Sequence, residues 1–307
     1  MQESTQTGLV VAAHGRHVLV ETPSGERLRC HPRGKKNETV VGDHVRWIPT
    51  GDEGSIESIE PRRNLFFRRD EVRTKAFAAN LDQILVLTAA EPEFSEHQLA
   101  RALIAAKAEG INALIGLNKR DLGDAFARAW QRLEPYRQMG YEVLPLALKP
   151  AHDRVMTPPE PALVAALDGR TTLLLGASGV GKSTLTNSLA PHAQALTNEI
   201  SRALQAGRHT TTSTTWYWVD RAKETALIDS PGFQEFGLQH VGAMQLAQCM
   251  PDIERHANAC RFHNCTHLHE PGCGVIAAVA EVGNGAISPR RYRIYGELFA
   301  ELSRSRY

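Results

Sequence analysis

The sequence lacks any apolar run long enough to cross a membrane, and its start, Met1–Gln6, has no apolar core of a secretion signal. We therefore expect a cytoplasmic protein without a membrane partner. An excess of charge of one sign is also missing. The net charge is +1, so no overall basic field attracts nucleic acid, and any RNA contact would have to come from local patches.

Cysteine is scarce, with five residues in a chain of 307. Cys30 and Cys249 stand alone, whereas Cys260, Cys265 and Cys273 lie close together among histidines. An odd number with such a cluster favours a metal site over disulfides in a reducing compartment. The length, with 42% hydrophobic and 22% charged residues, is that of a globular protein of two or three domains.

The segment from residue 8 to about 68 predicts short strands and no helix. The five strands are expected at Gly8–Ala12, His17–Glu21, Glu26–Cys30, His44–Ile48 and Ser55–Ile59. Such a pattern indicates a small barrel, with an OB-fold as our first choice, although an SH3-like barrel would give nearly the same pattern. Arginines and lysines are scattered through the segment, but acidic residues nearly balance them.

From about residue 72 to 237 strands and helices alternate. Predicted strands at 81–88, 113–117, 141–146, 171–175 and 225–228 are apolar and end in polar motifs, which indicates a parallel, doubly wound sheet. A helix is expected over Ser95–Ala108. Beyond about residue 238 the chain is rich in predicted helix and closes with an amphipathic segment, Pro289–Leu302.

A phosphate-binding loop follows the strand at 171–175. Gly176–Ser183 fits the pattern G-x-x-x-x-G-K-[ST], in which backbone N–H groups hold phosphate oxygens at a helix N-terminus. Lys182 would reach the β- and γ-phosphates, and Ser183 would bind Mg²⁺. The predicted nucleotide contacts here are Gly176, Ala177, Ser178, Gly179, Val180, Gly181, Lys182, Ser183 and Thr184.

A base-recognition motif lies upstream of that loop, which reverses the order of an ordinary GTPase. Asn118-Lys119-Arg120-Asp121 fits N-K-x-D. Asp121 would accept hydrogen bonds from N1–H and the 2-amino group of guanine, which adenine cannot offer. Asn118 would tie the motif to the phosphate loop, and Lys119 would lie along the ring. Ala147-Leu148-Lys149 is a further candidate for base contact.

Two segments are predicted to sense the γ-phosphate. Asp229-Ser230-Pro231-Gly232 fits D-x-x-G, with Asp229 on the magnesium side and the Gly232 N–H at the γ-phosphate. Gly207–Thr215 lies between Ser183 and Asp229 and supplies threonines for Mg²⁺. Thr211 is the candidate ligand, although Thr210 and Thr212 are equal alternatives from sequence.

The water-positioning glutamine that often follows D-x-x-G is absent, because Phe233 occupies that place. His209 and Thr211 are the nearest groups that could orient the attacking water. With Lys182 they form the predicted catalytic set. We expect slow hydrolysis until a partner completes the site.

The cysteine cluster has the ligand set of a closed structural zinc site. Cys260, Cys265, His267 and Cys273 supply three thiolates and one imidazole. The spacing leaves rival ligands in the neighbouring histidines His256, His263 and His269.

These features together resemble the circularly permuted GTPases of small-ribosomal-subunit biogenesis, the RsgA or YjeQ family. The resemblance rests on the order of Asn118–Asp121, Gly176–Ser183, Gly207–Thr211 and Asp229–Gly232, followed by the zinc spacing. It covers nearly the whole chain. Ala147–Lys149 departs from the Ser-Ala-Lys usual in the family.

The resemblance implies three domains: an OB-fold β-barrel that binds RNA (1–70), a circularly permuted α/β P-loop GTPase domain (71–237) and a helical zinc-binding domain (238–307). It also implies ribosome-stimulated hydrolysis of GTP to GDP and phosphate during late maturation of the small (30S) subunit. The expected cofactors are GTP or GDP, Mg²⁺ and Zn²⁺, and the expected partners are the small ribosomal subunit and its rRNA. We expect a monomer.

Two other functions fit part of the sequence. Phe233 favours an RNA-binding module that uses GTP only as a switch, with negligible hydrolysis. An ATPase would also carry the phosphate loop, but Asp121 argues against adenine.

Overall fold

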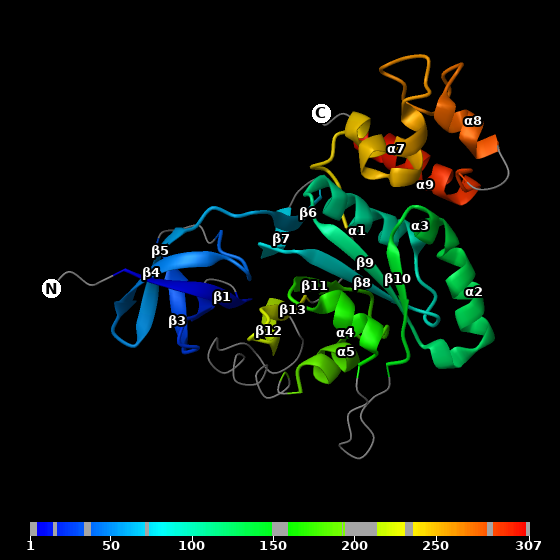
Figure 1. Cartoon of the computed structure of the whole chain (residues 1–307). Helices are drawn as coiled ribbons and strands as arrows, with labels where there is room; N and C mark the ends of the chain where they lie inside the picture. Colours follow the sequence, from blue (N-terminus) through cyan, green and yellow to red (C-terminus); the bar gives the residue numbers. More distant parts are fainter. Residues whose placement is uncertain are drawn as a thin grey trace.

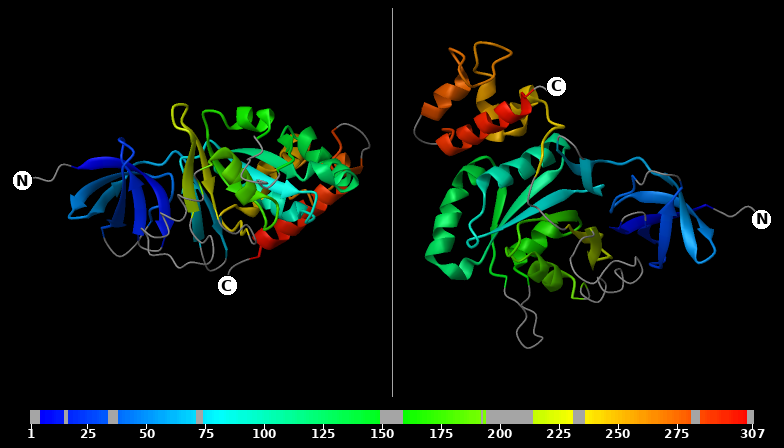
Figure 2. Two further views of the ribbon diagram at one scale, coloured as in Figure 1. Left: turned by 90° about the horizontal axis from the view of Figure 1, so that it is seen from below. Right: turned by 180° about the vertical axis from the view of Figure 1, so that it is seen from behind.

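The computed structural model describes residues 5–14, 17–33, 38–70, 74–148, 159–191, 193, 214–230, 236–280 and 285–304. Figures 1 and 2 show a β-barrel and a helical C-terminal domain on either side of a central domain with a β-sheet. Across these ranges, none of the helices combines the length and the apolar character that crossing a bilayer would require.

The N-terminal strands close into a barrel. They are β1 (Gln6–His14), β2 (His17–Glu21), β3 (Arg27–Pro32), β4 (His44–Thr50) and β5 (Glu53–Ile59). The order β1-β2-β3-β5-β4 closes because β1 also pairs with β4, and β3 runs parallel to β5. This topology is OB-like, which decides between the two barrels that the sequence allowed. Seven buried side chains fill the interior, among them Trp47, which is 2% exposed.

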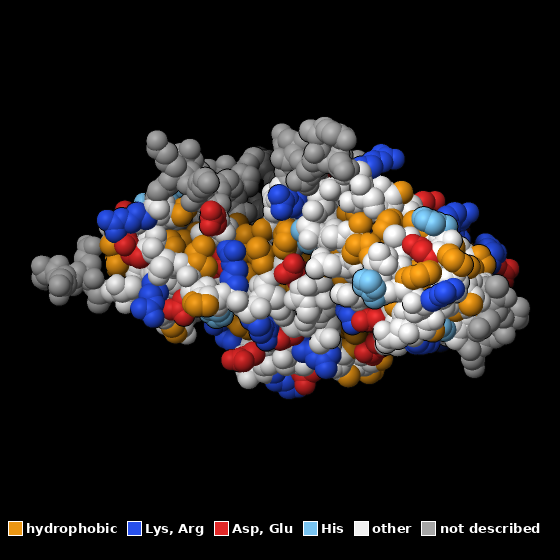
Figure 3. Space-filling view, turned by 90° about the horizontal axis from the view of Figure 1, so that it is seen from above, with side chains coloured by type: hydrophobic (Ala, Val, Ile, Leu, Met, Phe, Trp, Pro, Cys, Tyr) orange, Lys and Arg blue, Asp and Glu red, His pale blue; other side chains and the backbone are white. Residues whose placement is uncertain are grey.

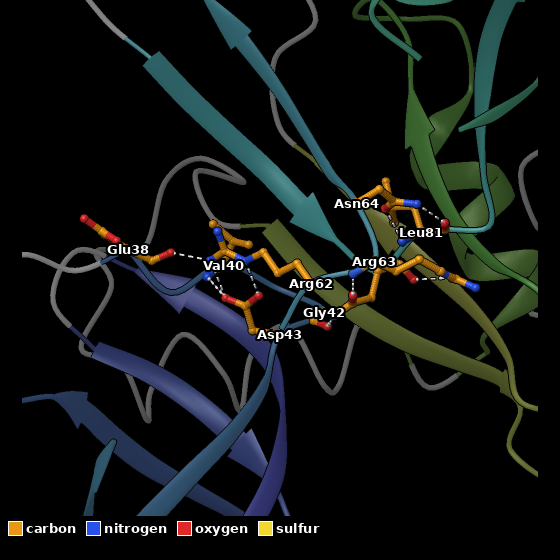
Figure 4. A network of polar contacts seen from close by, with 9 residues as sticks. Glu38, Val40, Gly42, Asp43, Arg62, Arg63, Asn64 and Leu81 are labelled. Carbon is orange, nitrogen blue, oxygen red and sulfur yellow. Dashed lines mark hydrogen bonds and ion pairs between the residues drawn. The ribbon is translucent and has the colours of Figure 1, made fainter. Parts of the chain in front are cut away.

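A hairpin that the strand pattern did not predict leads out of the barrel. It consists of β6 (Leu65–Arg69) and β7 (Thr74–Ala79). At its base the fully buried Asp43 accepts two hydrogen bonds from the Arg62 guanidinium, at 2.7 and 2.8 Å (Figure 4). Asn64 then exchanges hydrogen bonds with the backbone of Leu81 at the start of the central domain. The junction is therefore held by polar contacts, in which the Asp43 carboxylate is fully buried.

The central sheet contains five parallel strands in the order β10-β9-β8-β11-β13, with β12 antiparallel beside β13. The strands are β8 (Gln83–Ala89), β9 (Asn112–Asn118), β10 (Glu142–Pro145), β11 (Thr171–Leu175), β12 (Thr214–Asp220) and β13 (Thr225–Asp229). β12 also pairs with β1 of the barrel, so that one sheet runs from the central domain into the barrel.

Alternate residues of each central strand face opposite layers of helices. On one face α1 (Glu96–Ala108), α2 (Asp124–Arg132) and α3 (Glu134–Gln138) cover side chains such as Ile84 and Val86. On the other face α4 (Pro161–Leu167) and α5 (Lys182–Leu189) cover Leu85 and Leu87. Both faces are buried, as expected for parallel strands, and the predicted doubly wound sheet is confirmed.

The C-terminal domain is helical and packs against α1. It contains η2 (Ala243–Cys249), α7 (Pro251–Ala257), α8 (Gly274–Ala280) and α9 (Pro289–Leu302). Its buried residues Leu246, Ile253 and Leu298 belong to the same apolar cluster as the residues of α1. Arg291, 3% exposed, forms an ion pair with Asp252 at 2.8 Å. This domain thus shares its core with the central domain.

Candidate nucleotide-binding site and metal centre

The phosphate loop turns sharply from β11 into α5. Gly181, with φ of 108°, precedes the helix, and a Cβ there would lie 2.5 Å from the Asn118 side-chain nitrogen. At Gly176 a Cβ would lie 2.4 Å from the Leu87 carbonyl oxygen. Only glycine fits either position, since these neighbours are backbone or a fixed side chain. The close approach leaves the loop's N–H groups at the N-terminus of α5, where an anion is favoured.

Lys182 lies back along the phosphate loop. Its Nζ donates to the carbonyl oxygens of Gly176 (2.7 Å) and Ala177 (2.9 Å). Burial lowers the pKa of the Lys182 ammonium, and the charge of Asp229 opposes that shift. The Lys182 ammonium therefore lies against the phosphate loop, where it is expected to contact phosphate oxygens.

Asp229 ends β13 next to the strand that feeds the loop, because Leu174 of β11 pairs with Asp229 in the parallel register. Burial raises the pKa of the Asp229 carboxyl, while Lys182 and the Ser230 N–H favour its charged form. A carboxylate and the Ser183 hydroxyl are oxygen ligands of the kind that Mg²⁺ prefers. Ser183 is the second residue of α5, directly after Lys182. The oxygen donors of Ser183 and Asp229 are thus of the chemical type that fits Mg²⁺.

Asn118 joins the base motif to two other segments. Its side-chain amide donates to the Val180 carbonyl of the phosphate loop at 2.8 Å, and its Oδ1 accepts from the Leu148 N–H at 2.9 Å. The residue is 2% exposed. The sequence-based expectation that Asn118 bridges to the phosphate loop matches this contact.

The rest of the base motif turns away from the strand. Lys119 has a left-handed backbone with φ of 66°, after which Asp121 lies exposed in the short helix η1 (Arg120–Leu122). The Arg120 N–H donates to the Leu146 carbonyl, which holds the motif beside the segment with Ala147 and Leu148. The structure thus brings both predicted base-side segments together.

One residue of this region was missed by sequence reasoning. Glu160, at the N-cap of α4, accepts a hydrogen bond from the Ala147 N–H at 3.1 Å. The only signal for it was Pro161, which marks a helix start. With the bond from the Leu148 N–H to Asn118, this contact fixes two successive N–H groups of the segment.

Several predicted residues lie outside the described ranges. They are Lys149, His209, Thr210, Thr211, Thr212, Gly232 and Phe233. Their predicted roles in catalysis, Mg²⁺ binding and γ-phosphate sensing remain predictions from sequence.

The four predicted zinc ligands converge in the segment between α7 and α8 of the C-terminal domain. The ligand atoms of Cys260, Cys265, His267 and Cys273 all lie within 4.8 Å of one another. The Cys260 and Cys273 sulfurs are 3.8 Å apart, and His267 Nδ1 lies 3.4 and 3.6 Å from them. A tetrahedron with Zn–S bonds of about 2.3 Å has edges of about 3.8 Å, so the geometry and the chemistry of this donor set fit zinc.

The rival histidines point elsewhere. His256 Nε2 contacts the Gly285 carbonyl oxygen at 2.8 Å, and His263 and His269 are exposed. They are absent from the group of four converging ligand atoms.

Glu270, which the sequence did not single out, organises the turn between the ligands. Its carboxylate accepts hydrogen bonds from the N–H groups of Thr266, Leu268 and His269 and from the Thr266 hydroxyl. Burial alone would raise the pKa of Glu270, but these donors hold it well below its usual range. From the other side, Tyr295 and Tyr292 of α9 donate to the carbonyls of Thr266 (2.8 Å) and His267 (2.7 Å).

Comparisons with known proteins identify the family of the chain. The family model described as RsgA GTPase matches residues 59–239. A protein of Variovorax paradoxus (strain S110) named "Small ribosomal subunit biogenesis GTPase RsgA" is 66% identical over 301 residues, which cover 98% of this chain and 93% of the relative. The chain belongs to the RsgA GTPase family.

Other RsgA relatives extend the match over the full length. A protein of the same name from Bordetella pertussis is 49% identical over 307 residues, covering 100% of this chain and 99% of its own. The crystal structure of YjeQ from Thermotoga maritima has a TM-score of 0.73 at 28% identity, covering 99% of this chain and 100% of that one. YloQ, titled "a circularly permuted GTPase", has a TM-score of 0.69 at 26% identity, with 99% and 98% covered.

RsgA membership confirms the family, fold class and activity that the sequence predicted. The chain is a GTPase, a hydrolase acting on GTP. Its motif order is that of a circular permutation, since β9 with the base motif precedes β11 with the phosphate loop.

Proposed function

We propose that this RsgA-family GTPase binds the small ribosomal subunit and assists its late maturation, with GTP hydrolysis stimulated by the subunit. The observation that carries the proposal is the Asn118 bridge, which joins the guanine motif, the phosphate loop and the Ala147–Leu148 segment into one nucleotide site. Two of the relatives are named small ribosomal subunit biogenesis GTPases, which supports the choice of partner.

In this proposal the phosphate loop, Gly176–Ser183 with Thr184, holds the phosphates of GTP or GDP. Lys182 exchanges its two carbonyl acceptors for phosphate oxygens, and Ser183, Asp229 and Thr211 hold Mg²⁺. The ion would supply charge stabilisation at the phosphates. Asp121 and Lys119 recognise guanine, Gly232 contacts the γ-phosphate, and His209 with Thr211 orients the attacking water.

We assign the four converging ligands Cys260, Cys265, His267 and Cys273 to a structural zinc ion. All four positions of a tetrahedron would be filled by protein atoms, so the ion would hold the turn and leave no place for substrate.

The proposed domains are 1–70, 71–237 and 238–307, with the barrel and the zinc domain as the parts that contact rRNA. On the face in Figure 3 basic and acidic side chains are intermixed. Several arginines of the barrel pair with acids, such as Arg33 with Glu57 and Arg46 with Glu60. RNA binding would therefore depend on local exchange of ion pairs. We propose a cytoplasmic monomer.

Phosphate release with and without purified small subunits tests the proposal. We expect stimulation on the order of a hundredfold or more, as for other GTPases completed by a partner. Lys182→Ala should abolish the stimulated rate. If GTP promotes subunit binding while hydrolysis stays negligible, the chain is a GTP-switched RNA-binding module instead.

Base choice is tested by Asp121→Asn. The carboxylate accepts two hydrogen bonds from guanine, whereas an amide nitrogen would donate to the 2-oxo group of xanthine. We expect GTP affinity to fall by on the order of a hundredfold or more and XTP binding to appear. Competition of ATP with GTP on the unaltered protein would contradict guanine recognition.

A further inference from the structure

The segment between α7 and α8 contains a turn of four successive exposed residues. This turn lies between two of the converging ligands, Cys260 and Cys265, and consists of Arg261, Phe262, His263 and Asn264. Because both cysteines direct their sulfurs into the ligand group, the residues between them face outward. Figures 1 and 2 show the segment on the side of the C-terminal domain that faces away from the central domain, where a partner can reach it.

Backbone hydrogen bonds fix the turn. The Arg261 N–H donates to the Gly272 carbonyl oxygen at 3.0 Å, and the Cys265 N–H donates to the Phe262 carbonyl oxygen at 3.3 Å. Gly272 has a left-handed backbone with φ of 74°, and a Cβ there would lie 3.2 Å from the Arg261 Cβ. The turn is therefore held at both ends before a partner arrives, which lowers the entropy lost on binding.

Phe262 is an exposed aromatic residue with a cation over its ring. In the described part of the chain the large apolar side chains that are clearly exposed are Leu122, Val164, Met244 and Phe262, and only the last is aromatic. Phe262 is 40% exposed, and the Arg261 guanidinium carbon lies 5.5 Å from its ring centroid. The ring attracts a cation at this distance. The exposed surface of Phe262 is open to a second planar group.

The charges of this segment favour an anionic partner. Among the described residues Arg261 has no carboxylate partner. Residues 258–274 contain one acid, Glu270, and its carboxylate already accepts hydrogen bonds from the backbone and Thr266. In the barrel, by contrast, Arg33 and Arg46 are paired with glutamates. Arg261 can therefore contact a phosphate without first breaking an ion pair.

We propose that Phe262, with Arg261 over its ring, is a platform on which an unpaired base of rRNA stacks. Proteins recognise single-stranded RNA by stacking its bases on aromatic rings and guanidinium planes. In this arrangement the ring of Phe262 contacts the base and Arg261 contacts the adjoining phosphate. The inference rests on the proposed function, and it names the surface of the C-terminal domain that contacts rRNA.

The alternative partner for this platform is a protein. Protein interfaces also use aromatic residues and arginine, but they bury about 800 Å² on each side around an apolar centre. The neighbours of Phe262 on the turn are Arg261, His263 and Asn264, so the turn exposes one apolar ring among polar groups. A stacked base needs no larger apolar surface than one ring, which favours RNA.

The test uses the full chain, loaded with zinc, in five forms: unaltered, Phe262→Ala, Phe262→Tyr, Arg261→Gln and the matched control Met244→Ala. Met244 is 52% exposed on η2 of the same domain and lies outside the turn. Affinity for purified small subunits is measured at several salt concentrations, together with zinc content and Tm. A photo-crosslinking phenylalanine analogue at position 262 then identifies the molecule that touches the platform.

Phe262→Ala should weaken subunit binding by about tenfold, a usual effect of losing one stacked base, and should leave the salt dependence unchanged. Phe262→Tyr should bind within about twofold of the unaltered protein, because the ring is kept. Arg261→Gln should weaken binding and lower the slope of log affinity against log salt by about one, as expected for a lost phosphate contact. Met244→Ala should change neither quantity, and the crosslink should form to rRNA.

The platform is overturned if Phe262→Ala binds the subunit as tightly as Met244→Ala does, or if the crosslink forms to a ribosomal protein. Because the crosslink uses an aromatic side chain at position 262, it tests the platform even if Phe262→Ala loses zinc. Absence of subunit binding by the unaltered protein would defeat the proposed function, whereas normal binding by Phe262→Ala defeats the platform alone.

Discussion

The barrel and the C-terminal domain are joined to the GTPase domain in different ways. The barrel has an interior core of its own around Trp47, and it is joined through strand pairing between β1 and β12 and through the buried Asp43–Arg62 pair. The C-terminal domain places its apolar residues in the core of the GTPase domain and adds side-chain ion pairs.

This difference decides how strongly each domain depends on its neighbour for stability. A unit with its own core and directional backbone bonds keeps its structure when its neighbour changes. A unit that borrows its core responds to its neighbour's helices, and the proposed zinc ion would add local stability to the C-terminal domain. We therefore expect perturbations of the C-terminal domain to reach the nucleotide site more readily than perturbations inside the barrel.

Zinc removal should produce the largest difference in stability between the C-terminal domain and the barrel. Chelation, or Cys265→Ser, removes an ion whose binding contributes on the order of 10 kcal/mol in small zinc domains. Hydrogen exchange should then show loss of protection at Thr266, Leu268 and His269, while β2 and β4 of the barrel stay protected. Equal loss in both regions would contradict the independence of the barrel, and unchanged zinc content in Cys265→Ser would contradict the site.

The pH dependence of zinc binding is a second test of whether the barrel is independent of the C-terminal domain. Without metal, burial raises the pKa of the Cys265 thiol to about 12. Zinc binds the thiolate and must displace the proton, so the affinity falls as pH falls below that pKa, by about tenfold per unit for each proton released. Competition with a chelator at several pH values measures the slope. The stability of the barrel should not follow this slope.

Removing one partner of the buried pair at the barrel junction should have a smaller but clear effect. Arg62→Ala leaves the Asp43 carboxylate, 0% exposed, without its cation, which typically costs about 3–5 kcal/mol. Arg46→Ala is the matched control, because the side chains of Arg46 and Glu60 are 60% and 37% exposed and such surface pairs contribute about 0–1 kcal/mol. Denaturant unfolding of both variants measures the difference. Equal losses would mean that the junction does not depend on the buried charge.

The smallest expected effect concerns the two hydrogen bonds that Tyr292 and Tyr295 of α9 donate to the segment of the proposed zinc ligands. Tyr295→Phe leaves the Thr266 carbonyl without its donor, at a cost of about 1–2 kcal/mol. Tyr292→Phe is the control, since Tyr292 is only half-buried and water can replace its hydroxyl. Zinc affinity and Tm should fall more for Tyr295→Phe. A larger loss for Tyr292→Phe would show that burial of the hydroxyl does not decide the contribution of these hydrogen bonds.

The sequence predicted what depends on local patterns. The alternation in the first strands, the apolar run before Gly176 and the spacing of Cys260 to Cys273 each reflect a constraint within a few neighbouring residues. The choice between an OB-fold and an SH3-like barrel could not be made that way, because it depends on β1 closing onto β4.

Contacts between distant segments left no such pattern. Arg101 and Glu301 are 200 residues apart, and each alone is an ordinary charge on an amphipathic helix. The β6–β7 hairpin was missed because Leu65–Phe67 continues directly into arginines, without the alternation of a half-buried strand. Glu270 was missed for a related reason: its partners are backbone N–H groups, which every sequence has.

The central place of β8 has a consequence for synthesis of the chain. β8 pairs with β9, which follows soon after it, and with β11, where Gln83 meets Thr172 after 89 further residues. At translation rates of about 5–20 residues per second, the second edge of β8 waits roughly 4–18 seconds for its partner. During that time the nascent chain carries the guanine motif on a half-sheet with an open edge. Nucleotide can stabilise this domain only after the phosphate loop has left the ribosome that made it.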